Sequence, residues 1–303
     1  MHKDFTMDSS VFFYPVIVNS TLEKIDINSN LHLRKISDAE IATFFGIENR
    51  ELTKDFFLSK CNLRAEGYFP FGADPTYHVL MDSLPLFSSN YVLVSTKGAS
   101  DAHTFNLIAK LISPGKSGTY IGFNNKAPSL QIISPNPYFK QGECLTLTKR
   151  NEVYSRGLFN KVDRLLDKDR QFSLLRDVFL YSLSGTKIRD ETRFLDLMTI
   201  LEVLFLKDGA EGELKYRLSI RLDKIFQKFY GENPSTIFNV FMNNSTGLYK
   251  IRSEIVHRGS TKILTKDFLA NLVEIVRKSL LLYIDNPINF KVEKLNNIVL
   301  SEK

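Results

Sequence analysis

The first half of the chain alternates short apolar runs with turn residues, a pattern typical of β-strands. Runs that fit a strand lie at 11–18, 31–35, 77–81, 91–95, 119–123, 130–133 and 144–148. Two stretches with helical spacing interrupt them, one at 41–45 after the capping-box pattern Ser37-Asp38-Ala39-Glu40, the other at 101–111. We therefore expect a mixed, β-rich domain over residues 1–148.

From about Lys149 onward the apolar positions recur at helical spacing. Helices are predicted at 151–168, 171–184, 190–207, 211–230, 235–258 and 265–284, with a break near Asn243 in the fifth. The short connections favour antiparallel packing of neighbouring helices. The fold class is thus predicted to be α+β, with the β-rich domain followed by an all-α, up-and-down bundle at 149–303.

The composition is that of a globular protein, with 43% hydrophobic residues. The length of 303 residues is enough for two domains. The chain does not begin with a secretory signal, and its most apolar stretch, 194–206, is too short to span a bilayer. We therefore expect a cytoplasmic protein that does not engage a membrane. Cys61 and Cys144 lie far apart and fit neither a disulfide framework nor a zinc site, so core thiols are expected. No motif predicts a metal or another cofactor.

The net charge of +6 is concentrated in the second half of the chain. Residues 1–150 hold 15 basic and 14 acidic side chains, whereas residues 151–303 hold 25 and 20. This mild basic bias is compatible with a polyanionic ligand such as RNA.

One segment near the C-terminus combines apolar spacing with an arginine and a histidine. At about 100° per residue, a stripe predicted to face the core has Arg252 near its middle and consists of Leu248, Tyr249, Ile251, Ile255 and Val256. A buried guanidinium needs a carboxylate, a phosphate or a cleft that water reaches, unless the side chain extends to the helix edge. His257 lies about 140° further round the helix. Gly259 predicts that the helix ends just after this histidine.

Two other predicted helices carry polar residues relevant to Arg252. On the apolar helix at 190–207, a polar strip of Asp196, Thr199 and Glu202 is either a solvent-facing edge or a sign that Glu202 has a cationic partner. The candidate partners are Arg252, Arg217 and Arg221. On the next helix Glu213, Arg217 and Arg221 follow at four-residue spacing, most simply as a solvated charge ladder and alternatively as part of the same site.

The segments 201–204, 213–219 and 248–259, in this order and spacing, resemble the Apea-like branch of the HEPN superfamily over about residues 190–285. The resemblance implies a helical bundle that commonly dimerises, with the arginine and histidine of each chain meeting at the interface. Many members are metal-independent endoribonucleases of toxin–antitoxin or antiphage systems, and others are noncatalytic binding or assembly modules.

Carried over to this chain, the resemblance makes Arg252 and His257 the catalytic pair. The supporting residues are Glu202, Ser253, Tyr249, Arg258 and Arg217. The chain departs from the family pattern at two positions: Arg258 separates His257 from the glycine that often follows the histidine directly, and Ser253 is smaller than the polar residue that often follows the arginine.

The chemistry of RNA cleavage gives these residues roles. Without a metal, cleavage needs a base for the 2'-hydroxyl proton, a cation for the phosphorane and an acid for the leaving oxygen. Arg252 suits the second role because a guanidinium binds phosphate oxygens in pairs. His257 is the only histidine after residue 149. Two chains are therefore needed to supply two imidazoles, which favours a symmetric dimer.

We accordingly expect a homodimeric endoribonuclease that acts on RNA as a toxin or antiphage effector. In this interpretation the domain at 1–148 senses a trigger or positions the substrate, and a second protein inhibits or activates the enzyme. Two alternatives stay open. One is a noncatalytic HEPN module that binds nucleic acid or a protein, with Arg252 in a structural ion pair. The other is an unrelated helical interaction protein.

Overall fold

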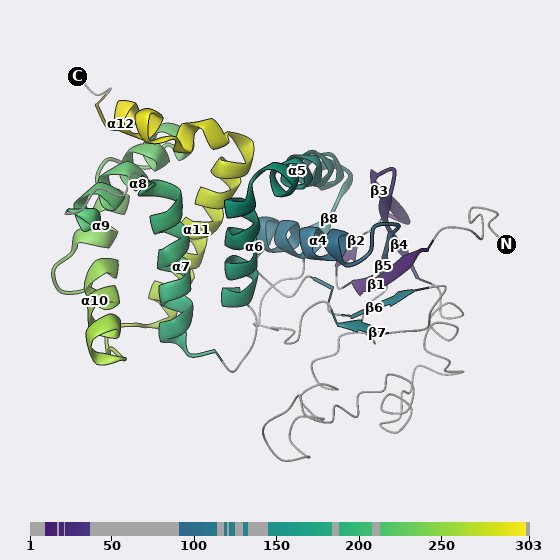
Figure 1. Cartoon of the computed structure of the whole chain (residues 1–303), viewed down its shortest axis with the longest axis horizontal. Coiled ribbons are helices and arrows are strands. Elements are labelled where there is room, and N and C mark those ends of the chain that lie inside the picture. The colour runs from purple at the N-terminus through teal and green to yellow at the C-terminus, as the bar shows by residue number, and fades with distance from the viewer. Residues whose placement is uncertain are drawn as a thin grey trace, which may run out of the picture. The chain divides into compact units, whose positions relative to one another are not determined.

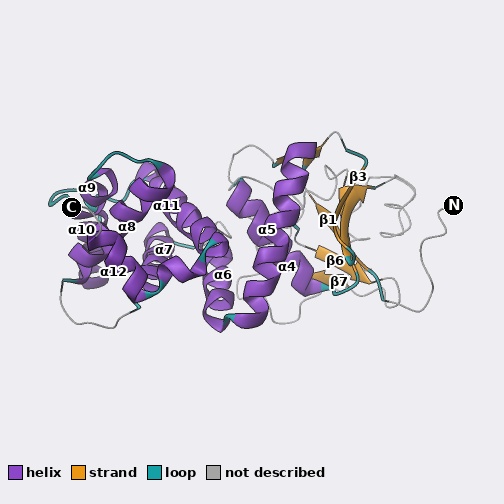
Figure 2. Cartoon of the chain, turned by 90° about the horizontal axis from the view of Figure 1, so that it is seen from above, coloured by secondary structure: helices purple, strands orange, loops and turns teal. Residues whose placement is uncertain are grey.

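The computed structural model describes residues 10–16, 18–20, 22–36, 91–113, 118–119, 121–124, 130–132, 145–183, 188–207 and 213–300. These residues form two compact units, one up to Arg164 and one from Leu165 onward. The first unit holds a sheet with helices beside it and the second consists of helices (Figures 1 and 2). The predicted α+β class is confirmed. The expected strand at 77–81, the expected helix at 41–45 and both cysteines lie outside the described residues.

The first unit is built on a six-stranded antiparallel sheet in the order β3-β4-β5-β1-β6-β7. The strands are β1 (Phe12–Val16), β3 (Lys24–Asn28), β4 (Leu31–Lys35), β5 (Tyr91–Ser95), β6 (Ile121–Asn124) and β7 (Leu130–Ile132). A short parallel pair joins β2 (Asn19–Ser20) to β8 (Thr146–Leu147). Every predicted run within the described residues contains a strand. Sequence reasoning missed β3, although its exposed and buried side chains alternate as a half-buried strand requires.

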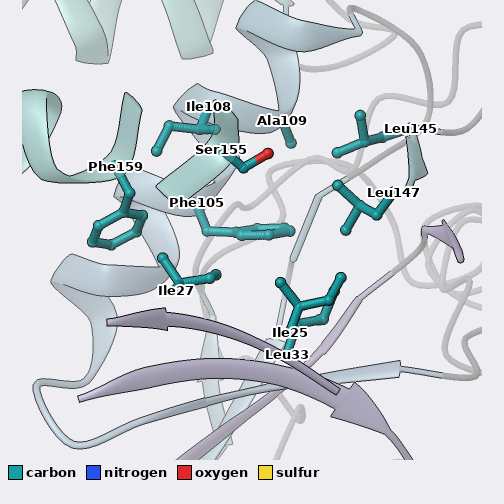
Figure 3. Close-up of a pocket in the computed structure, with 10 residues that line it drawn as sticks. All are labelled: Ile25, Ile27, Leu33, Phe105, Ile108, Ala109, Leu145, Leu147, Ser155 and Phe159. Carbon is teal, nitrogen blue, oxygen red and sulfur yellow. The ribbon is translucent and has the colours of Figure 1, made fainter. Parts of the chain in front are cut away.

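Strand β5 is central, and all its residues are buried. On one face of the sheet, Val92 and Val94 pack with Val11 and Phe13. Against the other face lie α4 (Ala99–Ile112) and the first part of α5 (Lys149–Lys168) (Figure 2). An apolar cavity of about 20 Å³ lies between them, and Figure 3 shows its lining: Ile25, Ile27, Leu33, Phe105, Ile108, Ala109, Leu145, Leu147, Ser155 and Phe159. This volume suffices for about one water molecule.

The second unit is a set of helices around α7 (Asp190–Phe205), whose apolar side chains are almost all inaccessible to solvent. Helix α7 contacts α6, α8, α10 and α11. The remaining helices are α6 (Arg170–Leu183), α8 (Leu214–Tyr230), α9 (Thr236–Met242), α10 (Leu248–Arg258), α11 (Lys266–Asp285) and α12 (Val292–Leu300), with a 3-10 turn at Pro287–Phe290. The predicted helix at 235–258 is divided into α9 and α10 as expected, whereas α12 was not predicted.

A buried carboxylate fixes α9 against α8. Asp223 is 5% exposed, and its oxygens accept hydrogen bonds from the backbone N–H groups of Ser235, Ile237 and Phe238, each at 3.1 Å. The first N–H groups of a helix have no partner within it, so an acidic side chain there satisfies them and meets the positive end of the helix dipole. Asp223 thereby orients α9, the helix that leads into α10.

Candidate functional site

The start of α10 is set by a tight turn after α9. Asn243 Oδ1 accepts hydrogen bonds from the backbone N–H groups of Ser245 and Thr246, and the N–H of Gly247 donates to the Asn243 carbonyl at 2.9 Å. A Cβ atom at Gly247 would lie 2.4 Å from that carbonyl oxygen, so only glycine fits this approach without rearrangement. The Gly247 carbonyl then accepts from Ile251 and begins the helix.

The end of α10 follows the prediction made from Gly259. This glycine has a φ of 74°, in the left-handed region, and its N–H donates to the Ile255 carbonyl at 2.8 Å. Glycine is favoured at such a helix end because it adopts positive φ without steric cost. The histidine of the predicted pair therefore lies in the last turn of α10.

The buried face of α10 is narrower than predicted. Leu248, Ile251 and Ile255 are buried, but Val256 is 55% exposed, so its place in the core-facing stripe was wrong. The midpoint of the buried face, taken from these three residues, lies about 60° to 80° around the helix axis from Arg252. Arg252 consequently lies at the edge of the buried face and not at its middle, and its side chain is 36% exposed.

Glu202 of α7 is the partner of Arg252. Arg252 Nε lies 2.8 Å from Glu202 Oε1, and Nη2 donates to Oε2 at 3.3 Å. A cationic partner was one of the two interpretations of Glu202, and of the three candidate arginines the structure places Arg252 in contact with it. Arg221 instead donates to the Phe205 carbonyl and to Asn296 Oδ1, both at 2.6 Å. Arg221 is 4% exposed, so the interpretation of a solvated ladder was wrong for this residue.

The geometry of the pair leaves one edge of the guanidinium open. Glu202 occupies the edge formed by Nε and Nη2, and the described part of the chain places no hydrogen-bond or ion-pair partner on Nη1. The edge formed by Nη1 and Nη2 is the one that usually receives a second oxyanion end-on. Arg252 can thus hold Glu202 and still bind an anion.

Tyr249 completes the surroundings of Arg252. The guanidinium carbon lies 6.0 Å from the centre of the Tyr249 ring, at the outer limit of a cation–π contact. The Tyr249 hydroxyl is buried and makes no hydrogen bond of acceptable geometry to any described residue. Burial, and secondarily the nearby Glu202 carboxylate, raise the pKa of Tyr249 to about 12. The hydroxyl therefore stays protonated at neutral pH, buried near the Glu202 carboxylate.

His257 lies apart from Arg252. Its side chain is exposed, and no described residue forms a hydrogen bond or an ion pair with it. Because the two residues are about 140° apart around the helix, one chain does not place the imidazole and the guanidinium on the same face of α10. In a single chain the guanidinium of Arg252 and the imidazole of His257 therefore project from different sides of α10.

The other predicted supporting residues are distributed around this centre. Ser253 is exposed on α10, and Arg217 lies in the first turns of α8, half-buried. Arg258 follows His257 in the last turn of α10. Its positive charge, like that of Lys250, lowers the pKa of Glu254. The side-chain contacts that the structure identifies for Arg252 are those with Glu202 and Tyr249.

Sequence reasoning missed a contact that orders the connection after α10. Thr261 Oγ1 donates to Glu254 Oε2 at 2.5 Å, and the N–H of Ile263 donates to Thr261 Oγ1 at 3.2 Å. This hydrogen bond, followed by that of Lys250, holds the pKa of Glu254 below its ordinary range. No periodicity in the sequence signals it, because the threonine lies outside any regular element.

Two properties of the described regions bear on the chemistry available. Within those ranges, three or more His, Cys, Asp or Glu side chains do not gather as a metal ion would require. The helices described are all too short or too polar to cross a membrane.

Comparison with family models, with curated proteins and with solved structures gives no match.

Proposed function

We propose that the chain is a metal-independent endoribonuclease of the HEPN type that acts as a homodimer. The observation that carries this proposal is the orientation of Arg252. Glu202 holds one edge of the guanidinium at 2.8 and 3.3 Å and leaves the other edge open, on a helix whose last turn carries an exposed histidine. A cation fixed by a carboxylate costs little further reorganisation when it binds a phosphate.

The residues suit cleavage by the 2'-hydroxyl of the RNA. This oxygen forms a bond to phosphorus while the bond from phosphorus to the 5'-oxygen breaks, which yields a 2',3'-cyclic phosphate and a 5'-hydroxyl. One imidazole takes the proton of the 2'-hydroxyl, and a second, protonated imidazole gives a proton to the leaving 5'-oxygen. Arg252 binds the nonbridging oxygens, where negative charge builds up. The two imidazoles are those of His257 in the two chains.

The exposed face of α10 supports the dimer. Ser253 and Val256 are exposed there, with Arg252 and His257 on either side of them around the helix. A second copy of α10 packed on this face covers Val256 and lies between the two edges that carry the predicted catalytic groups. The dimer thereby supplies what one chain lacks, a second imidazole close to a guanidinium.

The test compares Arg252→Ala, Arg252→Lys and His257→Ala with the wild type in RNA cleavage, using Lys294→Ala on α12 as a control. Loss of a general acid–base should lower the rate by about 10²- to 10⁴-fold. Arg252→Lys should restore little, because an ammonium cannot hold Glu202 and a phosphate in the same fork. If Arg252→Ala and His257→Ala remain folded dimers with undiminished cleavage, this assignment is wrong.

Mixed dimers test whether the site is shared. A dimer of one wild-type chain with one His257→Ala chain keeps both copies of Arg252 but only one imidazole. Because the proposed mechanism needs two imidazoles, its cleavage rate should fall far below half of the wild-type rate, whereas a rate of about half in verified mixed dimers contradicts a shared site. If the protein is a toxin or antiphage effector, its expression should arrest growth or block phage only when both residues are intact.

The same ion pair also supports a second candidate function. Because Arg252 is bound to Glu202, it can serve as a structural link between α10 and α7 in a noncatalytic module that binds nucleic acid or a protein. Salt-dependent RNA binding without cleavage at any protein concentration favours this alternative.

A further inference from the structure

The connection from α10 to α11 is the most basic segment near the predicted catalytic pair. Residues 250–266 contain five basic side chains (Lys250, Arg252, Arg258, Lys262 and Lys266) and one acidic side chain (Glu254), an excess of four. The whole chain has a net charge of +6, so 17 residues hold most of it. Asp267 follows directly, and counting it leaves an excess of three.

The structure holds this segment in a defined position. The hydrogen bond from Thr261 to Glu254, at 2.5 Å, ties the connection back to α10, and the N–H of Ile263 closes the turn on Thr261. Ile263 and Leu264 are partly buried, whereas Lys262 is exposed between Thr261 and these anchors. The connection is thus fixed on its apolar side and presents its lysines to solvent.

Most of the basic side chains of the connection have no ion-pair partner among the described residues. Arg258, Lys262 and Lys266 are exposed, and no described residue forms an ion pair with them. The one acidic side chain of the segment, Glu254, is already engaged by Thr261 and by Lys250, whose Nζ lies 3.4 Å away. Exposed cations that follow the proposed phosphate-binding arginine along the chain attract further phosphates of the same polymer.

We propose that this basic connection, defined by Arg258, Lys262 and Lys266, binds the RNA backbone beside the bond that is cut. The proposal rests on the proposed ribonuclease function and adds the course of the substrate: the RNA extends from Arg252 and His257 along the end of α10 towards the start of α11. The contacts are with phosphates of a single strand, and the connection confers affinity without base preference.

The experiment measures binding of a 2'-O-methyl RNA oligonucleotide, which cannot be cleaved by attack of its own 2'-hydroxyl. Binding of the full chain, of Lys262→Ala/Lys266→Ala and of Lys291→Ala/Lys294→Ala is followed at several salt concentrations. The control pair removes the same charge at α12, which lies at the opposite end of the helical unit from α10 (Figure 1). Circular dichroism verifies that every variant is folded.

Each single-strand phosphate contact contributes about 0.7 to the slope of log affinity against log salt, so loss of both lysines should flatten the slope by about 1.4. The affinity gap between wild type and variant then narrows roughly sevenfold when salt is raised fourfold. Lys262→Glu should weaken binding more than Lys262→Ala. The control pair should behave like the wild type.

An unchanged slope in Lys262→Ala/Lys266→Ala, or an equal change in the control pair, overturns the proposal. It is also overturned if the two lysines are required for binding to vesicles of phosphatidylserine and phosphatidylcholine but not to RNA. Because the oligonucleotide is uncleavable, its binding is independent of catalysis. Lack of cleavage of ordinary RNA by the wild type refutes the ribonuclease function alone, and the binding result still decides this proposal.

Discussion

The ion pair of Arg252 and Glu202 joins α10 to α7, and a double-mutant cycle measures the strength of this link. Unit charges about 4 Å apart attract by about 4 kcal/mol at an effective dielectric constant near 20. Lost water and lost side-chain freedom offset much of this, the latter by up to about 2 kcal/mol for one long side chain. The two side chains are 36% and 24% exposed. We therefore expect a coupling free energy of about 1 to 2 kcal/mol, larger than that of exposed ion pairs and smaller than that of buried ones.

The assay is urea unfolding of the wild type, Glu202→Ala, Arg252→Ala and the double variant. Far-UV circular dichroism follows the helices directly and suits a chain that has no tryptophan. A second cycle on Glu274 and Arg277 is the control. This pair is also bidentate, at 2.7 and 2.6 Å, but both residues lie on α11, so a coupling of only about 0.2 to 0.5 kcal/mol is expected.

The comparison of the two cycles decides the argument. Both pairs join an arginine to a glutamate through Nε and Nη2, but the Arg252 pair connects separate helices whereas the Arg277 pair lies within α11. A coupling free energy for Arg252 and Glu202 no larger than that of the control pair would refute the reasoning that Glu202 holds Arg252, and α10 with it, against α7.

Three further perturbations test other parts of the structure. Asp223→Ala should lower the free energy of unfolding by about 2 kcal/mol, because backbone N–H groups of α9 lose a charged acceptor; an unchanged urea midpoint would contradict this role. Ser155→Ala should stabilise the first unit by about 1 kcal/mol by removing a buried hydroxyl without a described partner, visible as a higher Tm, and a lower Tm would indicate a hydrogen bond there. Glu254 has a pKa lowered below its ordinary 4.5, so its stabilising contribution is present above that value and is lost as the pH falls through the lowered pKa. Wild type and Glu254→Gln should differ in Tm at neutral pH and converge in acid, whereas a constant difference would oppose this assignment.

Local signals in the sequence were sufficient where a short stretch decides the structure. Gly259 ends α10 because a left-handed residue is needed there, and the asparagine-rich break before Gly247 separates α9 from α10. Strand β3 is an exception: Ile25 and Ile27 alternate with Lys24 and Asp26, yet sequence reasoning missed it, although it is as long as β4 and β5. The end of α10 and the break before it depend on residues a few positions apart, so the sequence is sufficient to predict them.

Signals that depend on distant residues were less reliable. The helical projection placed Val256 in the core because it treated every side within about 100° of Leu248 as buried. How wide the buried face is depends on the helices that cover it, and α10 is covered only along the side of Leu248, Ile251 and Ile255. Arg221 was assigned to solvent because Glu213, Arg217 and Arg221 follow one another at the spacing of a charge ladder, whereas α12 supplies Asn296 to bind it.

By itself, the sequence determined the α+β class and the end of α10 at Gly259, because apolar period and turn residues are local properties. It offered a cationic partner as one of two interpretations of Glu202. Only the tertiary structure decided which arginine meets Glu202, which edge of that arginine stays open and how Thr261 holds the basic connection. These contacts join residues that are 50 and 7 positions apart, and the first is set by the packing of α10 on α7 and the second by the turn after α10.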